Sequence, residues 1–298
     1  MTLKNAFCEF LITQELKGNS DKTISYYKNC ITPLLQFVGA DLMLSDLTAE
    51  ILRKYALNLK HKGISSNSFK TYLKGIKVFL NWLYLEEYTQ ANLSDKLQLP
   101  KAQRKTIDTL TPQEIKALLS LFDIKNYQGL RNYCICALML DSGLRKSEIV
   151  ALNVSDVHIF EGYILVNGKG NKQRIVPIGN NSKKHLIKYI SQRPFGVSSE
   201  RLFLTRTLTP ITDTVISRLF KTIQTQKVRT DLLSARIHAH LLRHTFATTY
   251  LENGGNIYTL QQILGHTTLD MVKKYVHITQ SKAVVNFKNY SPLDNLNT

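Results

Sequence analysis

The sequence predicts a mainly α-helical protein of two domains, the second of which also contains a small antiparallel β-sheet. Apolar residues recur at helical spacing through the first hundred positions, and residues suited to helix capping precede these stretches. A polar, basic segment around Pro100 separates the two domains. Two β-rich runs flank the sequence NGKGNK and predict the sheet. The 298 residues are enough for two domains of ordinary size.

The first domain, expected over residues 1–105 with its linker, is predicted to be a helical bundle. Its amphipathic stretches cover residues 5–16, 20–39, 47–63 and 67–88. Ser20 and Asp21 are suited to begin a helix that ends near Gly39. Pro33 is expected to kink or break that helix. Three lysines lie off the apolar stripe of the last stretch, where they either contact phosphates or form a solvated face: Lys70, Lys74 and Lys77.

The second domain, expected over residues 106–298, begins with a well-marked helix. Thr111 can cap that helix, and Glu114 can complete a capping box. Pro112 suits the first helical turn. The remaining predicted elements are an apolar helix over 127–143, a hairpin over 163–178, and helices at 212–224, 238–252, 257–264, 269–277 and 281–289.

The charge of the chain suggests a polyanionic partner. The net charge is +17 at pH 7. Residues 1–100 hold 12 Lys and Arg against 9 Asp and Glu, a net of +3, so residues 101–298 hold the other 27 against 13, a net of +14. A Lys or Arg that neutralises a phosphate releases condensed counterions. The alternative is a protein that is merely basic, which charge alone does not exclude.

Several classes of protein do not fit the sequence. The four cysteines match neither a metal-binding spacing nor a secreted disulfide pattern, so we expect reduced packing residues: Cys8, Cys30, Cys134 and Cys136. No cationic and apolar signal peptide opens the chain. No run of eighteen or more apolar residues occurs, so no membrane span is predicted. We therefore expect a cytoplasmic protein.

A scattered set of side chains in the second domain fits metal-free attack on a phosphodiester. Arginines can hold the non-bridging oxygens, where charge builds up. A tyrosine can be the nucleophile, and histidine and lysine can move protons. The candidates are Arg145, Lys169, His240, Arg243, His266 and Tyr275.

Each candidate also has a plainer interpretation. Arg145 can pair with Glu148 three residues later, and Lys169 can serve as a soluble turn residue. Tyr275 can be one packed ring among 14 tyrosines. His240 and His244 share a helix face and raise the alternative of a zinc pair. Zinc proteases of that kind need Glu directly after the first His and a third protein ligand, whereas Leu follows here and no third ligand is apparent.

Five motifs together resemble the tyrosine recombinase family, which includes the phage integrases, Cre and the Xer proteins. They are SGLRKSEIVAL, GKGNKQRIVPI, HLLRHTFAT, LGH, and the closing run Tyr275, Val276, His277, in the order and spacing of that family. Two departures are Lys146, where an apolar residue is common, and residues 270–272, which replace a Thr-rich stretch. Neither removes a catalytic group.

The resemblance implies a role for each candidate residue. Arg145 and Arg243 resemble the pair that clamps the phosphate, and Glu148 resembles the acidic residue that supports the site. Lys169 resembles the hairpin lysine that protonates the leaving 5′ oxygen, and Tyr275 resembles the nucleophile. The two family histidines correspond to His240 and His266.

The implied activity is site-specific cutting and rejoining of DNA through a 3′-phosphotyrosyl intermediate. The implied plan is a core-binding domain over 1–105 and a catalytic domain over 106–298 that ends in a tail helix. The implied partner is a double-stranded recombination site, on which a free monomer assembles into a homo- or heterotetramer. No metal or other cofactor is expected. Two alternatives stay open: an enzyme like type IB topoisomerase, and a DNA-binding accessory factor without catalysis.

Overall fold

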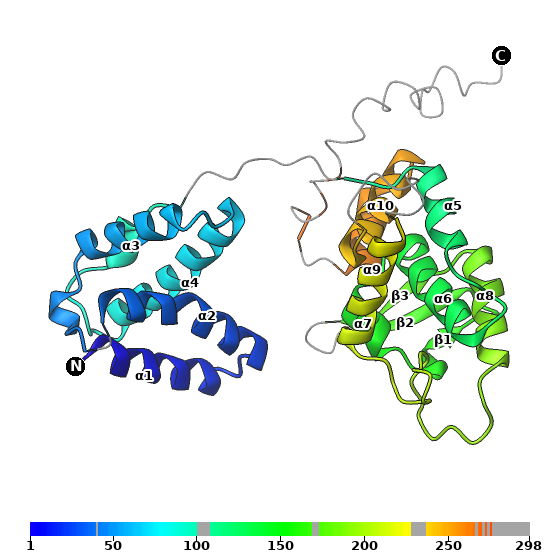
Figure 1. The fold of residues 1–298 in the computed structure, drawn as a ribbon, viewed down its shortest axis with the longest axis horizontal. Coiled ribbons are helices and arrows are strands. Elements are labelled where there is room, and N and C mark those ends of the chain that lie inside the picture. Colours follow the sequence, from blue (N-terminus) through cyan, green and yellow to red (C-terminus); the bar gives the residue numbers. More distant parts are fainter. Residues whose placement is uncertain are drawn as a thin grey trace, which may run out of the picture. The chain divides into compact units, whose positions relative to one another are not determined.

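The computed structural model describes residues 1–39, 41–99, 108–168, 173–227, 237–265 and 268–269, together with Val272 and Tyr275. The chain divides into two compact units, Met1–Arg104 and Lys105–Thr298. Each unit has its own hydrophobic core, and a small sheet occurs among the helices of the second (Figure 1). The fold is mainly helical, which confirms the predicted fold class.

The described residues of the first unit form four helices and two short 3₁₀ turns. The helices are α1 (Leu3–Leu16), α2 (Asp21–Val38), α3 (Ala49–His61) and α4 (Ser66–Leu85), and the turns are η1 (Leu44–Asp46) and η2 (Leu93–Lys96). All four helices begin at a Ser or Thr whose side chain accepts from the backbone N–H three residues later: Thr2, Ser20, Thr48 and Ser65. These caps satisfy donors that the first helical turn leaves unpaired. The predicted helical bundle is confirmed.

Helix α2 is not broken at Pro33, which rules out one of the two outcomes predicted there. The helix continues beyond Pro33 to Val38. Burial accounts for this, because Ile31, Leu34 and Leu35 all pack into the core on either side of the proline. Packing of an apolar face outweighs the loss of one backbone hydrogen bond.

Helices α2 and α4 approach each other closely at Gly75. A Cβ atom added to Gly75 would lie 2.5 Å from the Cβ atom of Cys30 on α2. Glycine therefore permits this crossing, because any side chain would force the two helices apart. Trp82, the only tryptophan in the chain, lies on the same helix and is buried in the same core.

The second unit is built around a buried central helix. Its elements are α5 (Pro112–Ser120), α6 (Tyr127–Asp141), α7 (Lys146–Ala151), η3 (Val154–Asp156), β1 (Val157–His158), β2 (Tyr163–Asn167), β3 (Gln173–Pro177), α8 (Asn180–Ser191), α9 (Asp213–Lys227), α10 (Ala239–Glu252) and α11 (Ile257–Leu264). Helix α6 contacts α8 and α10 and is buried along most of its length. The predicted capping box is present, with Thr111 and Glu114 bonded reciprocally.

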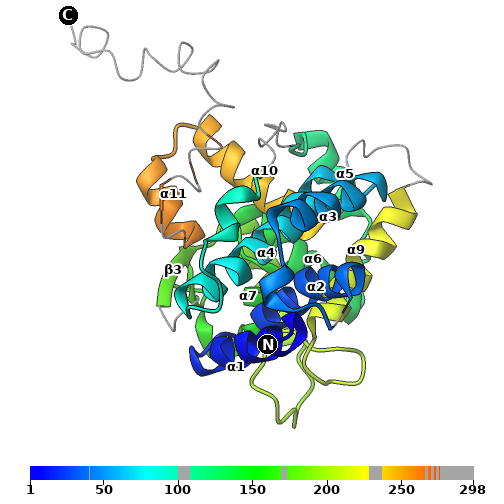
Figure 2. The same ribbon diagram turned by 90° about the vertical axis from the view of Figure 1, so that its left-hand side faces the viewer.

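The predicted hairpin forms the greater part of a three-stranded antiparallel sheet. Strands β2 and β3 pair from Tyr163 opposite Pro177 to Asn167 opposite Gln173. The short strand β1 adds to the other edge of β2 and was not predicted. Helix α11 contacts β3 (Figure 2), which brings the end of α11 to the hairpin.

The end of the chain is described only in part. Val272 and Tyr275 lie in helical backbone and pack with Ala247, Leu260 and Leu264. The rest of the helix predicted over 269–277 lies largely outside the described residues, and the one predicted over 281–289 lies entirely outside them.

Candidate active site

Arg145 stands at the start of α7, where Glu148 holds it twice. The backbone N–H of Arg145 donates to Oε2 of Glu148 at 2.8 Å, which caps the helix. Its Nη1 donates to Oε1 of the same carboxylate, also at 2.8 Å. The side chain of Arg145 is 30% exposed, whereas that of Glu148 is 6% exposed. The guanidinium therefore reaches the surface from a buried acidic support.

Arg174, on strand β3, binds the same carboxylate from the other side. Its Nη1 donates to Oε1 of Glu148 at 2.9 Å and its Nη2 to Oε2 at 2.8 Å. Burial raises the pKa of Glu148, but the hydrogen bonds and charges of Arg174 and Arg145 outweigh burial and bring that pKa below its ordinary value. Glu148 is therefore a carboxylate at neutral pH.

Arg243 lies on α10 and is only 4% exposed. Its Nη2 donates to the carbonyl oxygen of Leu264 at 2.7 Å, and its Nη1 donates to that of Gly143. Burial first, and the neighbouring charge of Arg145 second, lower the pKa of Arg243 to about 10. The side chain remains a cation at neutral pH and is fixed by main-chain acceptors.

The hydroxyl of Tyr275 contacts a histidine of α10. Tyr275 is 1% exposed, and its Oη lies 2.7 Å from Nδ1 of His244. Burial raises the pKa of Tyr275 to about 12, although the charges of Arg243 and Arg145 act in the opposite direction. The side chain is therefore a neutral phenol at pH 7 with an imidazole nitrogen already beside its hydroxyl.

His240 lies one helical turn before His244. Their ring centroids are 6.4 Å apart, and the ring of His240 is exposed. Among the residues that the structure describes, no three His, Cys, Asp or Glu side chains gather as a possible metal site. In the zinc alternative, His244 would share a metal ion with His240. In the structure, His244 instead contacts the hydroxyl of Tyr275.

The structure brings four of the six candidates, and Glu148, into one unit, while two lie outside the described residues. Lys169 lies in the sequence between β2 and β3, and His266 follows Gly265 directly; neither is described. Two further residues of the site had no predicted role in it: Arg174 and His244. A usable signal for His244 was its position next to Arg243. The usable signal for Arg174 was the position of this residue in the GKGNKQRIVPI motif, five residues after Lys169.

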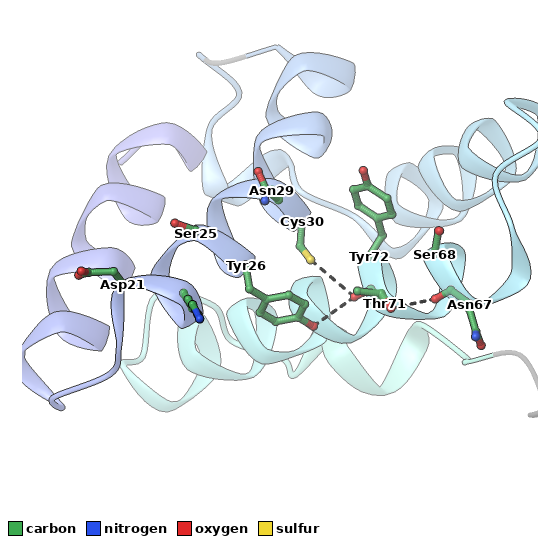
Figure 3. Close-up of a pocket in the computed structure, with 10 residues that line it drawn as sticks. Asp21, Ser25, Tyr26, Asn29, Cys30, Asn67, Ser68, Thr71 and Tyr72 are labelled. Atoms are coloured by element: carbon green, nitrogen blue, oxygen red, sulfur yellow. Dashed lines mark hydrogen bonds between the residues drawn. The ribbon is translucent and has the colours of Figure 1, made fainter. Parts of the chain in front are cut away.

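A polar hollow lies between α2 and α4 in the first unit. In Figure 3, Tyr26 and Cys30 of α2 point toward Thr71 of α4, whose carbonyl oxygen accepts from Tyr26 Oη at 3.2 Å and Cys30 Sγ at 3.6 Å. Burial raises the pKa of both side chains, that of Tyr26 to about 12. The other lining residues are Asp21, Lys22, Ser25, Asn29, Asn67, Ser68 and Tyr72. Hydroxyl and amide groups predominate, so the hollow suits hydrogen bonding.

Of the three lysines predicted to lie off the apolar stripe of α4, one is used within the fold. The ammonium group of Lys77 donates to the carbonyl oxygen of Leu97 at 3.1 Å. Lys74 is exposed and Lys70 is half-buried. None of the described helices is both long and apolar enough to cross a membrane.

Both units match families of known proteins. Residues 108–282 match the phage integrase family, and residues 3–99 match the phage integrase SAM-like domain. Tyrosine recombinase XerD of Oceanobacillus iheyensis is 30% identical over 286 residues, which cover 93% of this chain and 94% of that one. Tyrosine recombinase XerC of Bacillus pumilus is 28% identical over 299 residues, with 97% and 96% covered.

Solved structures share the fold. The Tn1549 transposon integrase in complex with circular intermediate DNA aligns with a TM-score of 0.79 at 21% identity, covering 98% of this chain and all of that one. The XerA recombinase aligns with a TM-score of 0.53 at 25% identity, covering 97% and 98%.

Fold and sequence together define a tyrosine recombinase, an enzyme that cuts and rejoins DNA. The chain belongs to the phage integrase family and is similar to the Xer recombinases within it. It is a site-specific recombinase, and the topoisomerase-like and non-catalytic alternatives are not favoured.

Proposed function

We propose that Tyr275 is the nucleophile of strand cleavage and that the surrounding side chains form its active site. The contact between the Tyr275 hydroxyl and His244 carries this proposal. The positive charges of Arg243 and Arg145 act on the same hydroxyl. A buried phenol beside a base and two fixed cations is the arrangement that attack on a phosphodiester requires.

Arg145 and Arg243 hold the non-bridging oxygens of the scissile phosphate. Both guanidiniums are positioned by hydrogen bonds before any substrate arrives, so little reorganisation is needed as charge develops. Glu148 supports Arg145. The family roles of three further residues are carried over to His240, His266 and Lys169 by their place in the motifs.

In the cleavage step, Oη of Tyr275 forms a bond to phosphorus and the bond from phosphorus to the 5′ oxygen breaks. The phenolic proton moves to Nδ1 of His244, which is the contact the structure supplies for it. Lys169 donates a proton to the departing 5′ oxygen. The products are a 3′-phosphotyrosyl link and a free 5′-hydroxyl.

Rejoining is the reverse step with a different 5′-hydroxyl. That hydroxyl gives its proton to Lys169, attacks the phosphotyrosyl phosphorus and expels Tyr275, which recovers its proton from His244. One phosphodiester is exchanged for another, so the reaction consumes no ATP. The side chains supply the charge stabilisation that a metal ion provides in other phosphoryl transfers.

The proposed substrate is a double-stranded recombination site bound by both units. The net charge of +17 favours a polyanion. The Tn1549 integrase, lambda integrase and XerH are all recorded with bound DNA. We assign the core-binding role to the first domain, residues 1–105, and catalysis to residues 106–298. Free protein is a monomer, and recombination proceeds in a homo- or heterotetramer on DNA.

Tyr275→Phe tests the nucleophile, because it removes one oxygen and keeps the ring that packs in the apolar cluster. The DNA is genomic duplex recovered by covalent trapping with the wild-type protein and then nicked near the cleavage point. We expect the variant to shift this duplex in a gel as the wild type does and to form no covalent adduct. Adduct formation by the Phe variant would assign the nucleophile to another residue.

The same assay is run in EDTA. Wild-type cleavage is expected to persist, since side chains supply every charge that the proposed step uses. Loss of cleavage in EDTA with recovery on adding Zn²⁺ would instead support a zinc role for His240 and His244.

His244→Ala tests the proton acceptor. We expect cleavage to slow by about 10²–10⁴-fold, the usual contribution of a positioned base, and to recover partly with added imidazole. DNA binding should be unchanged. A rate unaffected by the substitution would show that the contact with Tyr275 has no part in proton transfer.

A further inference from the structure

Three arginines from three different elements donate to three consecutive carbonyl groups at the end of α11. Arg174 Nε binds the oxygen of Ile263 at 2.7 Å, Arg243 Nη2 that of Leu264 at 2.7 Å, and Arg145 Nη2 that of Gly265 at 3.3 Å. The last carbonyls of a helix lack intrahelical partners and carry partial negative charge. The end of α11 is thus a common anchor for these three cations.

Arg174 also binds Glu148, the carboxylate that holds Arg145. Each of its three guanidinium nitrogens donates: Nε to Ile263, and Nη1 and Nη2 to the two oxygens of Glu148. Glu148 in turn binds the backbone and side chain of Arg145. One planar side chain therefore joins strand β3, helix α7 and the end of α11.

Gly265 leaves room for Arg174 to lie against its backbone. Its φ of 63° is the left-handed conformation that ends α11. A Cβ atom at this position would lie 3.1 Å from the Cδ, Cζ and Nε atoms of Arg174. The glycine both ends α11 and admits the guanidinium against its backbone.

We propose that Arg174 is a positioning residue for strand cleavage, which fixes Arg145 through Glu148 and fixes the end of α11 through Ile263. The inference rests on the proposed role of Arg145 at the scissile phosphate. In this proposal Arg174 acts through Glu148 and Ile263, to which its three nitrogens donate, and not through the phosphate. Its effect on the reaction passes through the geometry of Arg145.

A purely structural ion pair is the alternative. Removing one partner of a buried pair leaves an uncompensated charge and lowers stability wherever the pair lies. Both explanations predict a loss of stability, but they differ in their effect on the rate of cleavage. A positioning role predicts a slower chemical step in protein that is fully folded and bound to DNA, and it predicts that the effect depends on Glu148.

Arg174→Gln and Arg174→Lys are compared with Arg193→Gln. Arg193 also binds main-chain carbonyls, those of Arg201 and Leu202, outside the site. Single-turnover cleavage of the trapped and nicked genomic duplex is measured at saturating protein, where folded and bound fractions are checked by circular dichroism and gel shift. We expect Arg174→Gln to cleave about a hundredfold more slowly, the effect of roughly 1 Å of misplacement, with partial rescue in Arg174→Lys. The Arg193 variant should cleave at the wild-type rate.

A double-mutant cycle with Glu148→Gln tests whether Arg174 acts through this carboxylate. Coupled residues give non-additive effects, whereas independent ones multiply to within about twofold. We expect Arg174→Gln to slow cleavage little further in protein that already carries Glu148→Gln. A product of the two single losses would overturn the proposal, as would a wild-type rate for Arg174→Gln.

The pH dependence provides a readout that a structural role would not move. Three arginines act on Glu148, namely Arg145, Arg174 and Arg243. The carboxylate is the active form, and activity is lost as pH falls through its pKa. Removing Arg174 removes charges and hydrogen bonds that oppose burial, and so raises the pKa of Glu148. In the His244→Ala background, where the proposed base no longer titrates, the acidic limb of the cleavage rate should therefore move to higher pH. An unmoved limb would overturn the proposal.

Failure of this inference is distinguishable from failure of the proposed site. If Arg145→Lys cleaves normally, the role of Arg145 at the phosphate is wrong. If Arg145→Lys is slow while Arg174→Gln cleaves normally, only the positioning role of Arg174 is wrong.

Discussion

At the scale of single residues, the proposed site separates groups assigned to the reaction from groups that hold them. Tyr275 is kept as a phenol by burial, and His244 lies beside its hydroxyl. Arg145 is the more exposed arginine of the proposed clamp, whereas Arg243 is buried and bound to backbone. Arg145 is therefore the clamp residue whose side chain most directly faces an incoming substrate.

Arg145→Lys keeps the charge and removes the planar fork. A lysine cannot bind Glu148 and Gly265 through separate nitrogens as Arg145 does. We expect strand cleavage to fall by about a hundredfold or more, as when one preorganised donor is lost. Arg193→Lys is the matched control and should cleave normally. Near-normal single-turnover cleavage by Arg145→Lys would show that Arg145 has only a structural role.

At the scale of elements, local signals predicted helices well and long-range contacts poorly. The capping box of Thr111 and Glu114 spans three residues, so the sequence contained it completely. Helix α8 and strand β1 were not predicted; α8 begins after Gly179 with no side-chain cap, and β1 is only two residues long. The role of Arg174 depends on the carbonyl of Ile263, 89 positions away, which no local pattern indicates.

Gly75→Ala tests the helix crossing in the first unit. The added Cβ atom would lie 2.5 Å from Cys30 Cβ and 2.8 Å from its Sγ. Overpacking costs roughly 1–3 kcal/mol, while alanine in a helix regains at most about 1, so we expect a net loss of about 1–2 kcal/mol. Urea unfolding followed by fluorescence of Trp82 measures it.

The Cys30→Gly background provides the control for this crossing, because it removes both atoms that the new methyl group meets. Gly75→Ala should be tolerated there. Equal destabilisation in both backgrounds would show that the close approach of α2 and α4 does not explain the glycine.

At the scale of the whole molecule, two separate cores and a strong positive charge set how copies of the chain meet. Each unit buries its own apolar residues. A net charge of +17 opposes association of free copies, and DNA neutralises it. Fold class and family could be predicted from the sequence, because motifs and composition carry them. These signals do not carry the oligomeric state, because in the proposed tetramer it depends on surfaces that meet on DNA.

Assembly is tested by mass photometry of the free protein and of its complex with a duplex bearing two sites. We expect a monomer alone and four protomers on paired sites, since a head-to-tail contact that closes into a ring needs every member in place. Deleting residues 280–298, which lie outside the described residues, should spare single-site binding and prevent the four-protomer complex. Stable free tetramers, or full recombination by the truncated protein, would contradict this arrangement.

The anchoring of three arginines on main-chain carbonyls has an evolutionary consequence. Every amino acid carries a carbonyl group, so replacing Ile263 or Leu264 by another apolar residue removes no acceptor from Arg174 or Arg243. Drift at these two positions is limited by packing alone. Gly265 is not free in this way, because its backbone conformation and the guanidinium against it both disfavour a side chain. Lineages can therefore diverge around the anchor while the arginines and the glycine stay fixed.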